Sequence, residues 1–581
     1  PLVKDSGLFE LVYPLRSALP EAGKTIDQVS ISVSIRNDRG LKNIYSPSHA
    51  IDVIRKGEVE AVAGFEGKDV APNRDFKLYW VEDEKAIGVN VLTCRPDPSE
   101  DGYFMLMASP ANEIEQEKVL PRDVVFVFDK SGSMREDRKF EQAKSALRFC
   151  LSKLEKRDRF NILAFSTGVE SFKEKLVPAT GDNIGAGMKF IKHLRAAGGT
   201  AIDAALRTGL GMFRKNGNLP IMLFLTDGRP TVGTSDTGQI LSRFARVNQQ
   251  KVRTFVFGVG LNVNTKLLDR IAEKGRGVRT YVQPEESIEV KVSNLYKKIC
   301  SPVLSNVSVS CGKAEVHDVY PRDIPDIFTG SRLTVFGRYK NNGSIPVRIN
   351  GRSAGTEKEY VYTATFGGRE DTEFIPLLWA RRKVGFLLDQ VRLHGKEKEL
   401  VDEVTRLGKK YGIVTPYTSF LVVDDSTRVS GQSERRNTEE LKREIRKKEI
   451  AEFEKSLSGR SAQNASRTTA DYKTADKVDA PEANFSRQEK ELRDTGVSRS
   501  DIRHIGAKTF FRIRGIWQDS EYDPSMKDRT EKIEFLDKAY FRLLDSHPEI
   551  AKYMSLGSNL RLCWKGKVYR IYTDDTAGTN P

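Results

Sequence analysis

The run Val124-Val125-Phe126-Val127-Phe128, followed at once by Asp129-Lys130-Ser131-Gly132-Ser133, decides the fold of this 581-residue chain. Consecutive β-branched and aromatic residues predict a buried strand, and the small polar residues after it predict a turn. A helical pattern over 140–154 and a second buried run over 160–165 follow. Strands that alternate with helices in this way predict a doubly wound, mainly parallel sheet with helices on both faces.

The same alternation continues to about residue 300. Further buried runs predict strands at 221–225, 254–258 and 278–282, and helical patterns cover 183–195, 202–213 and 288–299. The sequence therefore predicts an α/β unit over 121–300.

Alternating runs on both sides of this unit predict antiparallel β structure. They lie at 28–35, 58–62, 76–81, 86–92 and 103–108 before it, and at 303–309, 333–339, 347–350 and 359–366 after it. Two helices, 377–393 and 397–411, and a strand at 419–423 complete a region that we place at 301–431. The flanks form either one β domain into which the α/β unit is inserted, or independent β domains.

The C-terminal quarter of the chain changes in composition. Within 432–500 we expect a charged helix at 437–457, with Asn437 and Glu440 as a capping box, and then a disordered linker over 458–500. A small α+β unit is expected over 501–581.

The formal net charge of +15 is concentrated in the α/β unit. Residues 122–300 hold 32 Lys and Arg against 18 Asp and Glu, whereas 434–499 hold 16 against 14. Such a block is either an ordinary solvated surface or the binding face for an acidic partner. Five cysteines exclude a disulfide scaffold, and no apolar run approaches the roughly 20 residues that span a bilayer.

Oxygen-bearing side chains follow the predicted strands where ligands bind in open α/β sheets, at the carboxyl ends. Asp129, Ser131 and Ser133 follow the first strand, Thr200 lies in a Gly-Gly-Thr turn before a helix, and Asp227 follows the third strand. This set contains neither His nor Cys, so it suits a hard divalent cation, Mg²⁺ or else Mn²⁺ or Ca²⁺. Because the protein supplies only two carboxylates, the coordination shell of the cation has room for a carboxylate from another molecule.

These motifs resemble the metal-ion-dependent adhesion site of the von Willebrand factor type A domain. The wider chain, over roughly 7–425, resembles the inter-α-trypsin inhibitor heavy chains and their bacterial relatives, with Thr231, Leu378-Trp379-Ala380-Arg381 and 410–419 fitting that pattern. The resemblance implies that 1–120 is a partial VIT domain, entered at about Tyr13, and that the protein works outside the cytoplasm, secreted, periplasmic or in the cell envelope. No Asp-Pro-His-Phe element occurs, so the covalent glycosaminoglycan attachment of vertebrate heavy chains is not carried over.

Enzyme signatures are missing from the same positions. A haloacid-dehalogenase phosphatase needs a second Asp where this chain has Ser131. Ser131 and Ser133 do not fit the Gly-x-Ser-x-Gly elbow of a serine hydrolase, a phosphate-binding P-loop is absent, and the six His show no metal-ligand spacing. We therefore expect no catalysis.

Three functions stay open at this point. The first is a metal-dependent adhesion module that binds an acidic protein ligand. The second is an intracellular assembly factor of a chelatase or ATPase complex, in which type A domains also occur. The third is a metal-independent binder of polyanions such as glycans; no arginine-rich stripe with aromatic residues favours sequence-specific nucleic acid.

Overall fold

The computed structural model describes most of the chain between residues 2 and 573. The residues outside the description are 1, 6–7, 16–25, 37–39, 71–74, 83–86, 111–120, 300–301, 329–330, 354–355, 368–371, 396, 419–449, 452, 454–455, 477–501, 506–507, 514 and 574–581. The strand expected at 419–423, most of the charged helix expected at 437–457 and residues 477–500 of the expected linker lie outside the described residues.

The α/β unit is built on a mainly parallel sheet with the order β12-β11-β10-β14-β15-β16. Its strands are β10 (Arg122–Asp129), β11 (Arg159–Phe165), β12 (Val169–Ser171), β13 (Val177–Pro178), β14 (Leu219–Thr226), β15 (Arg253–Val259) and β16 (Arg279–Val282). β10 is central and pairs in parallel with β11 and β14, while the short β12 and β13 pair antiparallel with β11. The doubly wound sheet predicted from the sequence is confirmed.

Helices cover both faces of this sheet, because successive residues of β10 point to opposite sides. Val124, Phe126 and Phe128 pack with α1 (Lys139–Ser152), α2 (Gly181–His193) and α6 (Ile288–Ile299). Val125 and Val127 pack with α3 (Ile202–Gly211), α4 (Thr237–Val247) and α5 (Thr265–Lys274). Because apolar layers cover both faces of the sheet, the polar side chains gather at the carboxyl end of β10.

The strands on either side of the α/β unit belong to one sheet. β9 (Gly102–Pro110) pairs antiparallel with β20 (Leu333–Tyr339), in the order β18-β20-β9-β8 with β18 (Val316–Tyr320) and β8 (Ile87–Cys94). Of the two arrangements left open by the sequence, the structure therefore has the α/β unit inserted between two neighbouring strands of an antiparallel sheet.

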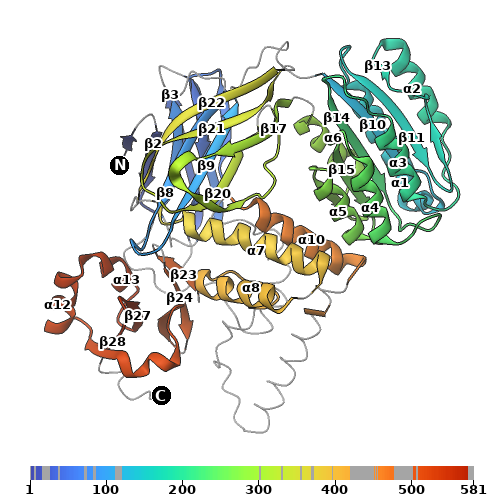
Figure 1. Ribbon diagram of the computed structural model, residues 1–581. Helices are drawn as coiled ribbons and strands as arrows, with labels where there is room; N and C mark the ends of the chain where they lie inside the picture. Colours follow the sequence, from blue (N-terminus) through green and yellow to red (C-terminus); the bar gives the residue numbers. More distant parts are fainter. Residues whose placement is uncertain are drawn as a thin grey trace, which may run out of the picture.

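Three further antiparallel sheets complete the β part of the chain (Figure 1). One contains β1 (Leu2–Asp5), β2 (Leu8–Tyr13), β7 (Phe76–Glu82) and β4 (Leu41–Tyr45), and one contains β3 (Ile26–Arg36), β6 (Glu60–Val70) and β5 (Asp52–Lys56). The third contains β19 (Ile327–Phe328), β17 (Pro302–Ser310), β21 (Gly343–Ser353) and β22 (Thr356–Phe366), with the short helix η3 (Gly312–Ala314) beside it. The first two share an apolar core that includes Leu41 and Phe76.

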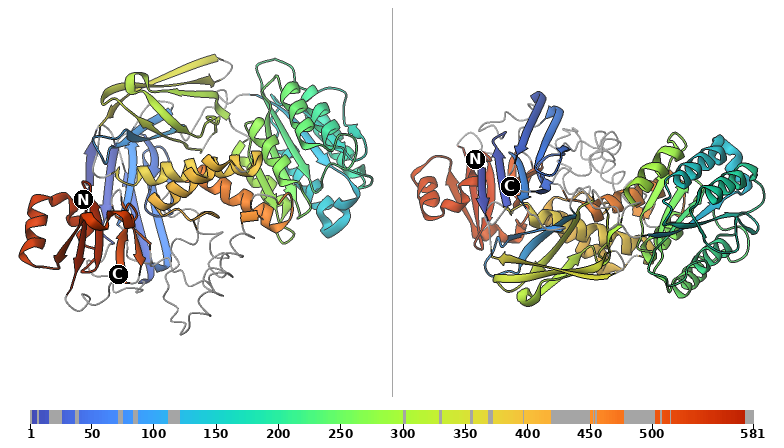
Figure 2. Two further views of the ribbon diagram at one scale, coloured as in Figure 1. Left: turned by 60° about the horizontal axis from the view of Figure 1, so that its bottom comes forward. Right: turned by 90° about the horizontal axis from the view of Figure 1, so that it is seen from above.

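A helical layer reaches from the β sheets to the α/β unit. α7 (Ile375–His394) and α8 (Lys398–Tyr411) share a core with β8 and β9, and α10 (Gly459–Thr474) lies beside α7 (Figure 2). None of the described helices is long and apolar enough to cross a membrane.

The linker expected over 458–500 is wrong for Gly459–Thr474, which forms α10. Small side chains explain the difference. Ala462, Ser466 and Thr469 are fully buried along one face of α10, so the two helices approach closely at Gly385 of α7. Burial here comes from close backbone approach, with Tyr472 as the one large apolar side chain of the described α10 residues that is buried, and a composition argument does not register contacts of this kind.

The C-terminal part has its own apolar core and forms the α+β unit expected there. Its sheet has the order β23-β24-β25-β27-β28-β26, with β23 (Ile502–Ile505), β24 (Lys508–Ile513), β25 (Ile516–Asp519), β26 (Thr530–Glu534), β27 (Leu560–Trp564) and β28 (Lys567–Tyr572). The helices are α12 (Lys538–Ser546), α13 (Ala551–Met554) and the short η6 (Pro524–Arg529) and η7 (Pro548–Ile550).

We predict that Gly385→Ala loosens α10. A Cβ at position 385 would lie 2.6 Å from the backbone nitrogen of Lys473 and 2.7 Å from the Cβ of Tyr472, so the helices must separate. Overpacking of this kind costs about 1–3 kcal/mol. Hydrogen exchange should become faster in peptides from 459–474.

The matched control is Gly185→Ala in α2, where a Cβ would meet nothing within 4 Å. That change should leave α10 unaffected and stabilise α2 by about 0.5–1 kcal/mol. Unchanged exchange in 459–474 for Gly385→Ala would contradict the packing described here.

Candidate metal centre

Asp129 ends the central strand and lies fully buried at its carboxyl end. Its Oδ1 accepts a hydrogen bond from the Ser131 backbone N–H at 2.8 Å, and its Oδ2 accepts one from the Thr226 hydroxyl at 2.5 Å. Thr226 stands opposite because β10 and β14 run in parallel with Phe128 level with Leu225. The strand register therefore fixes the orientation of this carboxylate.

Asp227 follows β14 and faces the two serines. The Ser133 hydroxyl donates to Asp227 Oδ1 at 2.8 Å, and the oxygens of Ser131 and Ser133 lie 3.2 Å apart. The ammonium of Lys139, the first residue of α1, lies 3.3 Å from Asp227 Oδ2 and is itself buried. The loop after β10 and the start of α1 thus bring two hydroxyls and one cation to Asp227.

Thr200 comes to the same rim from a separate loop. Its N–H donates to the Thr231 hydroxyl at 2.8 Å, and its carbonyl accepts from the Thr231 N–H at 3.0 Å. A Cβ on Gly228 would lie 3.2 Å from the Thr200 hydroxyl, which places that hydroxyl beside the residue after Asp227. The loop is tied to the first one because the Gly132 N–H donates to the Gly198 carbonyl at 2.9 Å.

The two carboxylates differ in their electrostatic surroundings. Burial raises the pKa of Asp129 to about 6, against the opposing effect of its hydrogen bonds from Thr226 and Ser131, and the nearby Asp227 raises it further. Among the described residues, no Lys or Arg forms an ion pair with Asp129, whereas Asp227 has Lys139. A buried carboxylate of this kind is stabilised by a cation held against it.

The donor set fits a hard divalent cation. Asp129, Ser131, Ser133, Thr200 and Asp227 gather at one rim, supply only oxygen atoms, and are buried except for the half-buried Ser133. Within the described part of the chain, no group of three or more His, Cys, Asp or Glu side chains is placed to hold a metal, so a cation here would rely on hydroxyls and water as Mg²⁺ does.

Sequence reasoning missed the roles of three residues around this rim. Thr226 orients Asp129, Thr231 holds the loop of Thr200, and Lys139 pairs with Asp227. Thr226 directly precedes Asp227 and Thr231 fits the heavy-chain pattern, but only the strand register and the loop contacts give these two residues a role. Lys139 lies 88 positions from its partner, and a buried Lys at the start of a helix carries no local signal.

Residues 122–281 match the family model of the von Willebrand factor type A domain. The chain is 27% identical over 369 residues to inter-alpha-trypsin inhibitor heavy chain H4 of Homo sapiens, which covers 58% of this chain and 39% of that protein. It is 29% identical over 343 residues to heavy chain H3 of Bos taurus, covering 55% of this chain and 38% of that protein. The aligned region is thus about two fifths of the length of these relatives.

Among solved structures, a von Willebrand factor type A protein from Catenulispora acidiphila is 16% identical, with a TM-score of 0.44, and covers 59% of this chain and 91% of that one. The family match coincides with the strands and helices around the oxygen-lined rim. The chain therefore contains a von Willebrand factor type A domain over 122–281, and its aligned region resembles the inter-alpha-trypsin inhibitor heavy chains.

Proposed function

We propose that the type A domain is a non-catalytic interaction module that binds a divalent cation and, through it, an acidic group of a partner protein. The family match and the heavy-chain relatives support a protein-interaction role in general. The observation that carries the metal-dependent form is the charge balance at the rim, set by Asp129, Asp227 and Lys139.

Lys139 makes this site favour an anion from outside. Two carboxylates formally balance a divalent cation, and the buried ammonium of Lys139 beside Asp227 then adds positive charge to the rim. Lys139 also lies 3.5 Å from Glu136, but that carboxylate is exposed, so water screens it and it offsets the buried charge only weakly. Excess charge in a poorly solvated site is costly, so a carboxylate from a partner both completes the coordination shell and balances the charge. When bound, the cation supplies an electrophilic contact for that carboxylate.

The charge of the whole unit supports the same class of partner. Residues 122–300 carry 32 Lys and Arg against 18 Asp and Glu. A field of this sign speeds encounter with anions and is screened by salt over about 8–10 Å. We expect the protein to act outside the cytoplasm, where such partners would be captured.

The first prediction concerns the cation alone. Titration of the full chain with Mg²⁺ or Mn²⁺ should give one site and raise the melting temperature, because binding only the folded state stabilises it. Asp129→Ala should abolish both effects. Asp182→Ala, a change of the same type on the exposed first turn of α2, should leave them intact. Equal affinity in Asp129→Ala and wild type would exclude this site.

The second prediction concerns Lys139. Lys139→Met keeps the buried stem but removes the charge beside Asp227, so cation affinity should rise by at least about tenfold while affinity for an acidic partner falls. Lys144→Met, on the same helix but paired with Glu141, is the matched control and should change neither. If both affinities fell together in Lys139→Met, the charge-balance argument would be wrong.

The third prediction separates the metal from the general field. In pull-downs with the full chain as bait, a chelator or Asp227→Ala should abolish capture of the specific partner. Added salt should mainly slow association and change dissociation less. Capture that persisted in chelator but vanished in moderate salt would instead favour a metal-independent polyanion binder.

A further inference from the structure

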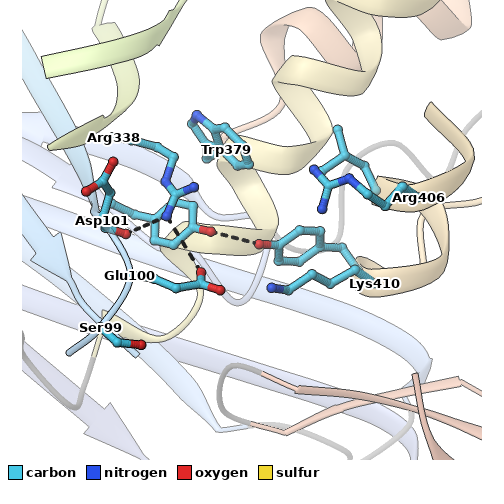
Figure 3. A pocket seen from close by; sticks show the side chains of 10 residues that line it. Ser99, Glu100, Asp101, Arg338, Trp379, Arg406 and Lys410 are labelled. Atoms are coloured by element: carbon cyan, nitrogen blue, oxygen red, sulfur yellow. Dashed lines mark hydrogen bonds and ion pairs between the residues drawn. The ribbon is translucent and has the colours of Figure 1, made fainter. Parts of the chain in front are cut away.

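A second polar pocket lies outside the type A domain, where the end of a β sheet meets the helical layer. It has a volume of about 340 Å³ and is formed by the turn before β9, by β20, by α7 and by the last turns of α8 (Figure 3). This volume is at the small end of the range for ligand pockets, about 300–1,000 Å³. The pocket therefore suits a small molecule.

The floor of the pocket holds a hydroxyl pair with one proton to spare. The hydroxyl oxygens of Tyr103 and Tyr411 lie 3.0 Å apart, and both side chains are buried. The two hydroxyls have two protons, and their mutual hydrogen bond uses one. Among the described residues, neither hydroxyl has another hydrogen-bond partner, so one O–H remains to donate to a molecule in the pocket.

The Tyr411 hydroxyl stays protonated in this setting. Burial raises the pKa of Tyr411 well above its usual value, and the neighbouring Tyr103 raises it further. The Tyr411 hydroxyl therefore keeps its proton over the whole physiological pH range.

The wall formed by α8 adds two cations, and the ammonium of one of them, Lys410, lies 5.9 Å from the centre of the Tyr411 ring. Hydrogen bonds to its carboxylate lower the pKa of Asp97, and this ammonium lowers it further. Arg406 and Lys410 are one turn apart and both line the pocket. Arg406 is held by Glu403, with contacts of 2.7 and 2.9 Å. Lys410 forms no ion pair with any residue that the structure describes. An unpaired ammonium beside a spare O–H donor is an arrangement for an oxyanion.

The wall formed by the turn before β9 carries negative charges that already have partners. Glu100 lies 3.7 Å from Arg338, and Asp101 lies 2.9 Å from His317. Arg338 also donates to the Asp101 backbone carbonyl at 2.6 Å. This wall attracts no further anion, and it would repel a second negative charge on a ligand that is bound at the α8 wall.

We propose that this pocket binds a small organic acid with a single carboxylate, which accepts hydrogen bonds from the Tyr103–Tyr411 pair and from Lys410. Glu100 and Asp101 select against a second carboxylate at the far end of the ligand. The site is independent of the metal centre, because it lies on β9, β20, α7 and α8 and uses none of the residues of the type A domain.

The test uses three five-carbon probes on the full chain: valerate, glutarate and cadaverine. Valerate should bind with a Kd of about 1 mM or tighter, glutarate about tenfold more weakly, and cadaverine not at all. Binding can be followed by ligand-detected NMR, and a chelator should not change it. The chelator arm keeps a failure here distinct from a failure of the proposed metal centre.

Two variants assign the binding to this pocket. Lys410→Gln and Tyr411→Phe should each weaken valerate binding by about tenfold, since hydrogen bonds to a charged group contribute more than neutral ones. The control is Lys409→Gln, the exposed neighbouring lysine, which should bind valerate like wild type. Melting curves show whether the buried Tyr411 variant folds, and the half-buried Lys410 position gives the test if it does not.

Three results would contradict the proposed carboxylate site. Absence of valerate binding at millimolar concentration would overturn the proposal. Cadaverine binding as tightly as valerate would do the same, as would valerate affinity that is unchanged in Lys410→Gln.

Discussion

The buried carboxylate of Asp269 joins the type A domain to the rest of the chain. It accepts hydrogen bonds from Arg392 of α7 at 2.7 Å and from Ser466 of α10 at 2.9 Å, and within its own domain it contacts Tyr281 at 2.7 Å and Arg279 at 2.9 Å. Asp389 and Lys473 extend the network with a contact of 2.6 Å. Buried charges are tolerated only when geometry and partners compensate for lost hydration, so this network specifies one orientation of the inserted domain on the helical layer.

The same helical layer reaches the candidate metal centre. The Gly459 N–H, at the start of α10, donates to the Leu261 carbonyl at 2.8 Å, and the Gln463 side chain donates to the Gly260 carbonyl at 2.5 Å. Gly260 lies directly against Lys139, since a Cβ there would be 3.5 Å from the lysine ammonium. Lys139 in turn pairs with Asp227. The loop after β15 is thus packed between the Lys139 ammonium and helix α10. A movement of α10 or of Lys139 is therefore resisted by contacts with this loop.

The sequence was informative where a local pattern has one physical solution. A continuous apolar strand such as 124–128 that alternates with helices is typical of a parallel sheet with helices on both faces, and polar residues after it then lie at the ligand-binding edge. The residues of the rim were therefore predictable, although their role as metal ligands stays a prediction. Lys139, Asp269 and Arg392 were not predictable, because each acquires its meaning from a partner far along the chain. Helix α10 was missed because its burial depends on Gly385 of another helix, and Ala, Ser and Thr without that partner resemble a solvated linker.

Charge balance separates the two candidate sites from two closed ion pairs in this protein. Arg122 with Asp158, and Arg253 with Asp326 at 2.7 Å, are closed pairs in which each charge has its complement, so neither points to a ligand. At the metal centre the balance is open toward a cation, because Asp129 has hydrogen-bond donors but no charged partner among the described residues. In the second pocket the unmatched groups are hydrogen-bond donors that suit an anion. Lys410 and one tyrosine hydroxyl can each donate a hydrogen bond, and neither has a hydrogen-bond acceptor among the described side chains. A buried polar or charged group without a partner costs free energy. When a fold keeps such groups at an accessible edge, a bound ligand supplies the missing charge or hydrogen-bond partner.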